Sequence, residues 1–282
     1  MADDPKTLVS TAWLASRLGN SDLRIIDGSW YLPDANRDPR AEYDAAHIPG
    51  ARFVALDDVS DDRSPLPHTV PPPELFVSRM RALGVGEGHQ VVVYDGAGLF
   101  SAARLWWLFG LMGKTNVAVL DGGFPKWRAE GRPVEDTPPM LRDRHIAAQR
   151  QNGLVKDVTE VAAALKLGDG EVVDARSPAR FRGEEPEPRP GLRAGHMPGA
   201  KNVHYRALLN EDGTMKDPDA LGQAFAEAGV DPAKPVITTC GSGVTAAILS
   251  LALERMGRPH ALYDGSWAEW GMYPDLPVAR GA

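Results

Sequence analysis

The chain of 282 residues repeats itself once, and this duplication limits the folds that it can adopt. Four landmarks of the first half return in the same order in the second half, at offsets between 143 and 149 residues. They are an apolar run ending in an acid (residues 24–27 and 171–174), His-X-Pro-Gly-Ala (47–51 and 196–200), an apolar run entering a glycine loop (91–95 and 236–240), and Asp-Gly-X-X-X-X-Trp (121–127 and 264–270). The length suffices for two domains that each bury a core. We therefore predict a duplicated domain, with residues 1–138 as the N-terminal copy and 139–282 as the C-terminal copy.

Within each half, short β-branched runs alternate with segments whose apolar residues follow a helical period. The helices expected from caps, prolines and glycine stops cover residues 10–17, 72–83, 101–112 and 244–256. This alternation is typical of α/β proteins, in which helices cover both faces of a parallel sheet. Glycines and prolines between residues 131 and 155 predict the connection between the two copies.

Composition and charge exclude several classes of function. The net charge of −7 and the pI near 5.5 argue against a nucleic acid or an anionic membrane as a partner, because both attract basic surfaces. No apolar run approaches the roughly 20 residues that a membrane-spanning helix needs. The first ten residues lack the basic and apolar regions of a secretory signal, and a single cysteine allows no intramolecular disulfide. We therefore expect a cytoplasmic protein.

The single cysteine, Cys240, follows a strand-like run and enters the loop Gly-Ser-Gly-Val-Thr, after which a helical pattern begins. The two glycines allow several backbone N–H groups to converge on one point, and the start of the helix adds partial positive charge there. Both effects favour a thiolate over a thiol. A lone cysteine is more often a small buried apolar residue. The strand, the glycine loop and the helix together favour a reactive nucleophile here.

Two chemistries use such a loop, namely phosphoryl transfer and sulfur transfer. A cysteine phosphatase with a loop of this type needs an arginine six residues after the nucleophile to clamp the phosphate oxygens. That position is Ala246, and the loop contains neither Arg nor Lys. The sequence therefore argues against a phosphatase.

Over nearly its whole length the chain resembles the tandem-domain rhodanese family, through the two repeated segments and above all through Cys-Gly-Ser-Gly-Val-Thr. This loop is similar to the active loop of the 3-mercaptopyruvate sulfurtransferases within that family. Members that use thiosulfate typically carry basic residues inside the loop, whereas a neutral loop suits a donor whose charge lies elsewhere. The resemblance implies that Cys240 carries sulfur as a persulfide, with the donor bound next to Gly241, Gly243, Val244 and Thr245.

The first half has Asp95 where the second half has Cys240. A carboxylate cannot carry sulfane sulfur. We therefore expect the N-terminal domain to be catalytically silent, with its loop, residues 96–100, in a structural or interfacial role.

A charged, proline-rich segment, Ala179–Arg189, occurs in the second half only. By itself such a run is most often a solvated loop. It is similar, however, to a segment of the mercaptopyruvate enzymes, and this resemblance implies that Arg180 and Arg189 bind the carboxylate and ketone oxygens of the donor. Guanidinium groups match planar carboxylates in shape and charge, which is consistent with that role. Arg182 is expected to pair with neighbouring acids.

The resemblance also implies a relay of Asp57, His68 and Ser242 that moves a proton to the departing pyruvate enolate. Without it, His68 would be an ordinary polar-loop residue. His47 and His196 occur in both halves, including the half without a nucleophile, and are therefore expected to be structural. The remaining histidines show no metal-ligand spacing, so we expect neither a metal nor another cofactor.

These observations lead to a sulfurtransferase that moves sulfur from 3-mercaptopyruvate to a thiol, a thioredoxin-like protein or cyanide. Two alternatives stay open at this point. One is a thiosulfate:cyanide sulfurtransferase, and the other is a non-catalytic sulfur carrier or redox module.

Overall fold

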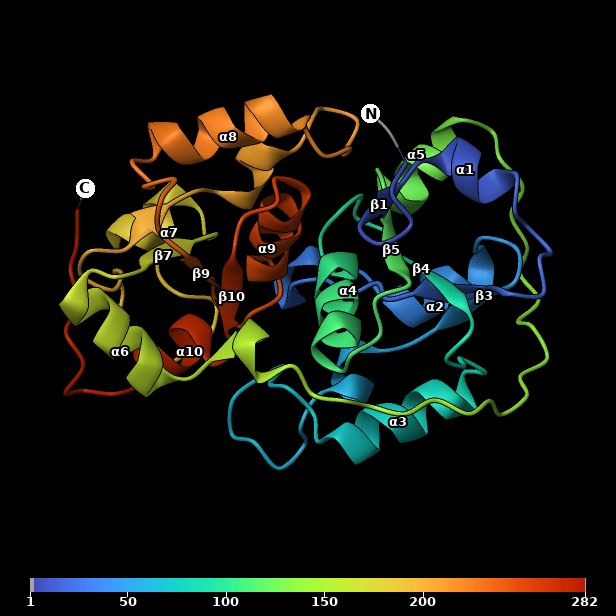
Figure 1. Cartoon of the computed structure of the whole chain (residues 1–282), viewed down its shortest axis with the longest axis horizontal. Coiled ribbons are helices and arrows are strands. Elements are labelled where there is room, and N and C mark those ends of the chain that lie inside the picture. Colours follow the sequence, from blue (N-terminus) through green and yellow to red (C-terminus); the bar gives the residue numbers. More distant parts are fainter. Residues whose placement is uncertain (1–2, 282) are drawn as a thin grey trace. The chain divides into compact units, whose positions relative to one another are not determined.

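The computed structural model describes residues 3–281 and divides them into two compact units (Figure 1). The first unit contains residues 3–62, 70–151 and 210–215, and the second contains residues 63–69, 152–209 and 216–281. Each unit is built on one five-stranded parallel sheet flanked by helices. The predicted α/β class with two tandem domains is confirmed.

The sheet of the first unit has the strand order β1-β5-β4-β2-β3, and all neighbouring strands are parallel. Its strands are β1 (Leu8–Val9), β2 (Leu23–Asp27), β3 (Ala51–Phe53), β4 (Gln90–Tyr94) and β5 (Val117–Leu120). Its helices are α1 (Thr11–Ala15), α2 (Pro39–Ala45), α3 (Pro73–Ala82), α4 (Ala102–Leu111) and α5 (Gly123–Ala129), with 3-10 turns η1 (Pro33–Ala35) and η2 (Leu56–Val59). The middle strand β4 carries Val91, Val92 and Val93, all fully buried. A continuous apolar run is what a strand covered on both faces requires.

The second unit repeats this topology with the order β6-β10-β9-β7-β8. Its strands are β6 (Val155–Lys156), β7 (Glu171–Asp174), β8 (Lys201–Asn202), β9 (Val236–Thr239) and β10 (His260–Tyr263). Its helices are α6 (Val158–Leu167), α7 (Pro178–Arg182), α8 (Pro218–Glu227), α9 (Ala246–Arg255) and α10 (Ser266–Trp270), with 3-10 turns η3 (Asn152–Leu154) and η4 (Tyr205–Leu208). Strand β9 is the counterpart of β4.

The repeated histidines have the same structural contact in both units. His47 stacks on Tyr43 with 4.0 Å between ring centroids, and its Nδ1 lies 2.8 Å from the carbonyl oxygen of Tyr43. His196 stacks on Phe181 at 3.8 Å and reaches the Phe181 carbonyl oxygen at the same 2.8 Å. Each histidine therefore fixes the helix that precedes it, α2 in the first unit and α7 in the second. This contact accounts for the repetition of the His-X-Pro-Gly-Ala segment.

The predicted helices are present, with shorter ends. The Ser10 hydroxyl accepts the N–H of Trp13 at 3.1 Å and caps α1, as predicted, but the helix ends at Ala15 and not at residue 17. Helices α3 and α4 agree with residues 72–83 and 101–112 to within one residue at each end. Helix α9 begins two residues later than predicted, because Gly243 has a φ of 78° and the turn around it continues through Thr245.

The compact units do not divide the chain at residue 138, where the boundary of the repeat was predicted. Residues 139–151 belong to the first unit, because the N–H groups of Gln149 and Gln151 donate to the carbonyl oxygens of Met112 and Leu111. Two short segments belong to the unit formed mainly by the other half of the sequence: residues 63–69 to the second unit and 210–215 to the first. As a consequence, His68 lies in the same unit as Cys240.

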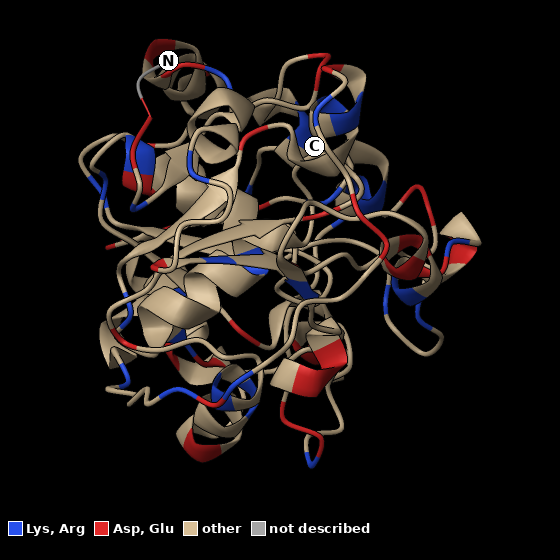
Figure 2. Ribbon diagram, turned by 90° about the vertical axis from the view of Figure 1, so that its right-hand side faces the viewer, with Lys and Arg blue, Asp and Glu red and all other residues tan. Residues whose placement is uncertain are grey.

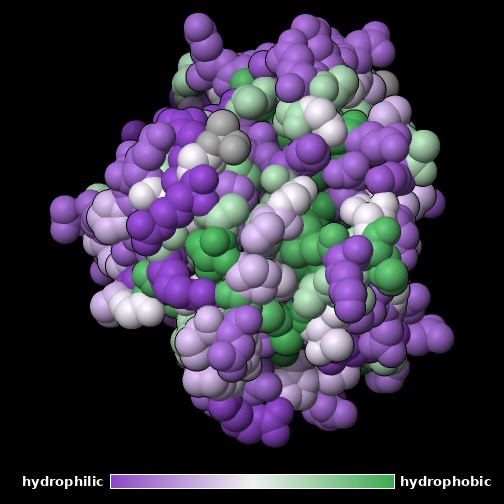
Figure 3. Space-filling view, turned by 90° about the vertical axis from the view of Figure 1, so that its left-hand side faces the viewer, coloured by the Kyte–Doolittle hydropathy of each residue, from purple (hydrophilic) through white to green (hydrophobic). Residues whose placement is uncertain are grey.

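Charged residues lie mainly on helices and loops, while the strands carry few of them (Figure 2). The view in Figure 3 shows a mostly hydrophilic surface with a smaller area of apolar side chains near its centre. Large apolar side chains are mainly buried, including Trp107, Trp127, Trp267 and Trp270. Among the described residues, no helix combines the length and the hydropathy needed to cross a membrane.

Asp27, at the end of β2, gives a prediction about stability. Burial raises the pKa of its carboxyl to about 6, in spite of hydrogen bonds from Ser29 and Tyr94. The folded state therefore binds this proton more tightly than the unfolded state does, and the contribution of the group to stability falls as the pH rises from about 4 to about 6. Asp27→Asn should remove this loss and raise the free energy of unfolding at pH 7 by about 1–3 kcal/mol. Urea unfolding at pH 4 and pH 7 measures the effect.

Asp174, at the end of β7, is the matched control. It occupies the same place in the second unit but pairs with Arg176 at 2.7 Å. Asp174→Asn should therefore destabilise the protein, because it weakens the partner of a buried guanidinium. An Asp27→Asn protein with the pH dependence of the wild type would contradict the prediction.

Candidate active site

Cys240 is the first residue after β9, a central strand of the second sheet. The residue is 2% exposed. The loop of residues 241–245 joins it to α9, whose first turn follows Thr245. The cysteine thus lies at the carboxyl edge of a parallel sheet and at the start of a helix, which is the common location of binding sites in open α/β sheets.

The peptide groups of the cysteine loop are held in one orientation by α10. The carbonyl oxygens of Cys240 and Gly241 accept hydrogen bonds from the N–H groups of Trp267 and Ala268, both at 2.9 Å. Ser266 starts this helix with a φ of 50°, and its hydroxyl accepts the N–H of Cys240 at 3.3 Å. These contacts turn both carbonyl groups toward α10.

The corresponding loop of the first unit contains an anion. The Asp95 carboxylate is fully buried and accepts hydrogen bonds from four backbone N–H groups, at 2.8 to 2.9 Å. The four donors are Ala97, Phe100, Ser101 and Ala102. The loop between a central strand and the following helix can therefore surround a negative charge with amides in this fold. In the second unit the residue at this position is the cysteine.

Ser242 is a meeting point of two predicted site residues. Its hydroxyl oxygen lies 3.1 Å from Nδ1 of His68 and 3.4 Å from Nη2 of Arg189. Ser242 and His68 are buried, and His68 has a φ of 58°. Such a backbone conformation is uncommon for histidine and occurs where the surroundings impose it. The structure thus brings together three predicted residues that lie far apart in the sequence.

Arg180 lies against the cysteine loop from another side. It belongs to α7, whose start is capped by Ser177. A Cβ atom on Gly241 would lie 3.0 Å from Nη2 of Arg180, so the absence of a side chain at Gly241 leaves room for the guanidinium. Burial and the charges of Arg206 and Arg180 lower the pKa of His204, which keeps this imidazole neutral next to the cationic group.

The other predicted site residues are placed as follows. Gly243 makes the left-handed turn of the loop, Val244 is buried, and Thr245 precedes the first residue of α9. Asp57 is exposed on η2 and belongs to the first unit. Its part in the relay stays a prediction.

Two residues of this region, Arg176 and Glu187, were not singled out from the sequence. Arg176 donates to Asp174 and to Glu187, and Glu187 in turn accepts a hydrogen bond from Arg180 at 2.5 Å. Burial by itself lowers the pKa of Arg176, but the carboxylates of Asp174 and Glu187 outweigh it and raise the pKa above its ordinary value. The contrast between Asp174-Ala-Arg176 and its counterpart Asp27-Gly-Ser29 was the sequence signal that could have identified the arginine.

Arg182 pairs with Glu184 at 2.7 Å, as predicted. Among the described residues, no group of three or more His, Cys, Asp or Glu side chains could hold a metal ion.

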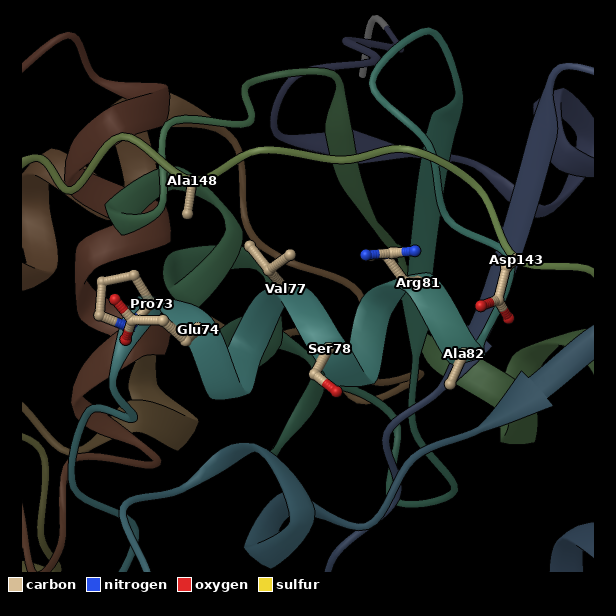
Figure 4. Close-up of a pocket in the computed structure, with 8 residues that line it drawn as sticks. All are labelled: Pro73, Glu74, Val77, Ser78, Arg81, Ala82, Asp143 and Ala148. Atoms are coloured by element: carbon tan, nitrogen blue, oxygen red, sulfur yellow. The ribbon is translucent and has the colours of Figure 1, made fainter.

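A surface pocket of about 480 Å³ lies in the first unit (Figure 4). It runs along α3, with Val77 and Arg81 on the helix and Asp143 and Ala148 on the segment that passes beside it. None of the predicted site residues lines this pocket. It is therefore no part of the candidate active site.

Comparison with known proteins gives consistent matches. Residues 10–130 and 157–273 each match the rhodanese-like domain family. The 3-mercaptopyruvate sulfurtransferase of Escherichia coli strain K12 is 42% identical, with 96% of each chain covered. The mitochondrial thiosulfate/3-mercaptopyruvate sulfurtransferase 1 of Arabidopsis thaliana is 40% identical over 96% of this chain and 77% of its own. The crystal structure of SseA from Escherichia coli, a 3-mercaptopyruvate sulfotransferase with the rhodanese fold, matches with a TM-score of 0.85 and 39% identity over 92% of this chain and 98% of its own.

The amide ring around Asp95 is open to a direct test. Asp95→Ala should lower the free energy of unfolding by at least about 2 kcal/mol, because four N–H groups, two of them in buried hydrogen bonds, lose a charged acceptor. Thermal unfolding measures this loss. Asp95→Asn, which keeps one acceptor oxygen, should lose less. Equal stability of wild type and Asp95→Ala would show that the ring contributes nothing.

Proposed function

Because this chain belongs to the rhodanese family, we propose that it is a 3-mercaptopyruvate sulfurtransferase that carries sulfur as a persulfide on Cys240. The sequence relatives supply the reaction class, and the cysteine loop supplies the chemistry. The single observation that carries the proposal is the amide ring around Asp95, because the equivalent loop of the same protein surrounds an anion there.

A thiolate or a persulfide anion at position 240 has the same need as the Asp95 carboxylate, namely hydrogen-bond donors around a negative charge. In the second unit, the carbonyl groups of Cys240 and Gly241 are engaged by α10 and are therefore directed away from such an anion. The start of α9 adds the positive end of a helix dipole. These features support Cys240 as the nucleophile.

The donor is a monoanionic keto acid whose charge is separate from the reacting sulfur. Arg180 next to Gly241 and Arg189 next to Ser242 place two guanidinium groups beside a loop that contains no basic residue of its own. We infer that they bind the carboxylate and the ketone oxygen, and that Gly241, Gly243, Val244 and Thr245 form the wall around the sulfur. Each charge-assisted hydrogen bond of this kind contributes about 1.5–3 kcal/mol.

In the first half-reaction, the Cys240 thiolate attacks the donor sulfur. An S–S bond forms, the C–S bond breaks, and its electron pair leaves with the pyruvate enolate. The enolate takes up one proton to become pyruvate. We assign the movement of that proton to Ser242 and His68, which are 3.1 Å apart. Asp57 is included as the acidic member on family resemblance alone.

In the second half-reaction, a nucleophilic acceptor attacks the outer sulfur of the persulfide and the Cys240 thiolate leaves. A thiol, a thioredoxin-like protein or cyanide has the required chemistry. Because the cycle depends on a free thiolate, we place the enzyme in a reducing compartment such as the cytoplasm.

Thiosulfate is the second candidate donor, because the Arabidopsis thaliana relative carries both donors in its name. The neutral loop favours the keto acid. A non-catalytic sulfur carrier would take up sulfur but would not turn over.

Cys240→Ser tests the covalent step. Exposure of the wild-type protein to 3-mercaptopyruvate without acceptor should add the mass of one sulfur atom, about 32 Da, to the Cys240 peptide, while the variant gains no mass and releases no pyruvate. Mass spectrometry and a pyruvate assay measure both. Pyruvate formation by the variant, at any rate above the uncatalysed one, would overturn the proposal.

Arg180→Ala tests the donor. Loss of one charge-assisted contact should raise the KM for 3-mercaptopyruvate by about tenfold or more, with a smaller effect on thiosulfate. Steady-state kinetics with both donors gives the ratio, and Arg182→Ala is the matched control from the same segment. Thiosulfate is the better assignment if the wild type turns it over with the higher kcat/KM.

A further inference from the structure

A buried chain of alternating charges leads from the sheet of the second unit to Arg180. Asp174, at the end of β7, accepts from Arg176 at 2.7 Å, Arg176 donates to Glu187 at 2.6 Å, and Glu187 accepts from Arg180 at 2.5 Å. The side chains of Asp174, Arg176 and Glu187 are at most 2% exposed, whereas that of Arg180 is 19% exposed. Arg180 is thus the accessible end of a chain whose other members are enclosed.

The enclosed members have few alternative positions. Arg176 also donates to the carbonyl oxygen of Gly195, and its guanidinium lies 4.4 Å from the ring centroid of Trp267. Glu187 uses one carboxylate oxygen for Arg176 and the other for Arg180. A guanidinium that is anchored in this way has already lost the rotamer freedom that a free arginine would lose when it binds a ligand.

The first unit shows that the fold does not require this chain of charges. Its strand β2 ends at Asp27, but the residue two positions later is Ser29 and not an arginine. The residue before the aromatic ring that stacks on the repeated histidine is Glu42, where the second unit has Arg180. Glu42 pairs with Arg37, whose Nη2 donates to the carbonyl oxygen of Gly96 in the loop after Asp95. A guanidinium therefore lies beside the loop in both units, but Arg37 is paired with a carboxylate that is 41% exposed, whereas Arg180 is paired with the buried side chain of Glu187.

We propose that Glu187 is a positioning residue for donor binding: through its bond to Arg180 it fixes that guanidinium beside the cysteine loop. This inference rests on the proposed function, in which Arg180 binds the donor carboxylate. Glu187 itself does not touch the donor. The negative charge of Glu187 also balances the positive charge of one of the two arginines, Arg180. The site therefore matches a single carboxylate better than a dianion.

Glu187→Gln separates a positioning role from a merely structural one. The variant keeps an acceptor oxygen but loses the charge, so Arg180 is held less firmly. We expect the KM for 3-mercaptopyruvate to rise by on the order of tenfold, with kcat within about threefold of the wild type. The KM for the acceptor should not change. Glu184→Gln, an exposed acid of the same segment that pairs with Arg182, is the matched control and should have wild-type constants.

The double variant Arg180→Ala/Glu187→Gln gives the decisive measurement. If Glu187 acts only through Arg180, its substitution adds nothing once Arg180 is absent, and the double variant has the KM of Arg180→Ala. Thermal unfolding and the fraction of enzyme that acquires the persulfide mass show how much of each protein is intact. If Glu187→Gln folds poorly, Glu187→Asp can be used for the same test. Aspartate keeps the charge but is too short to reach both Arg176 and Arg180.

Two results would overturn the inference while leaving the proposed function in place. One is an unchanged KM in Glu187→Gln with a lower melting temperature or a smaller active fraction, which is the signature of a structural role. The other is a double variant whose effect equals the product of the two single effects. A wild-type protein that forms neither pyruvate nor persulfide would overturn both the proposed function and this inference.

Discussion

In the first unit of this protein, backbone amides turn toward one carboxylate at the end of the central strand. Peptide N–H groups are obligatory donors, and a loop that points several of them inward must supply them with an anion or leave them unsatisfied. The first unit meets this requirement with a carboxylate of its own, Asp95, which accepts the hydrogen bonds of these N–H groups. The second unit has Cys240 at that position. In the proposed function, the sulfur of Cys240 takes the place of this structural anion and takes part in the reaction.

The duplication makes the functional adaptations visible, because one copy serves as a reference for the other. Both copies keep the stacked pair of a histidine and an aromatic ring and the buried tryptophan near the end of the repeat. They differ in how the arginine beside the loop is held: Glu42 in one copy corresponds in sequence to Arg180 in the other, and Ser29 corresponds to Arg176. Buried ion pairs add little net stability compared with apolar packing. The chain of charges in the second unit is therefore better explained by the orientation of Arg180 than by the stability of the fold.

Much of this organisation could be predicted from the amino-acid sequence. The repeated landmarks led to two α/β domains, and the strand, glycine loop and helix around Cys240 led to a nucleophile at a sheet edge. Helix positions were right to within about two residues at most ends, because caps, prolines and glycines act locally. The positions of long-range partners could not be obtained in this way. His68 lies 174 residues from Ser242 in the sequence, and only the exchange of residues 63–69 into the second unit brings the two within 3.1 Å.

The sequence by itself determined the class of the fold, and it predicted the nucleophile and a silent first loop, since these follow from residue types and spacing that act over a few positions. The tertiary structure alone decided which charges meet. Glu187 is one of several acids in a segment that looks solvated, and its near-complete burial between Arg176 and Arg180 depends on how the segment folds back over β7 and α7. Electrostatic partners are set by distance in space and by exclusion of water, and neither quantity can be read from the order of residues along a chain.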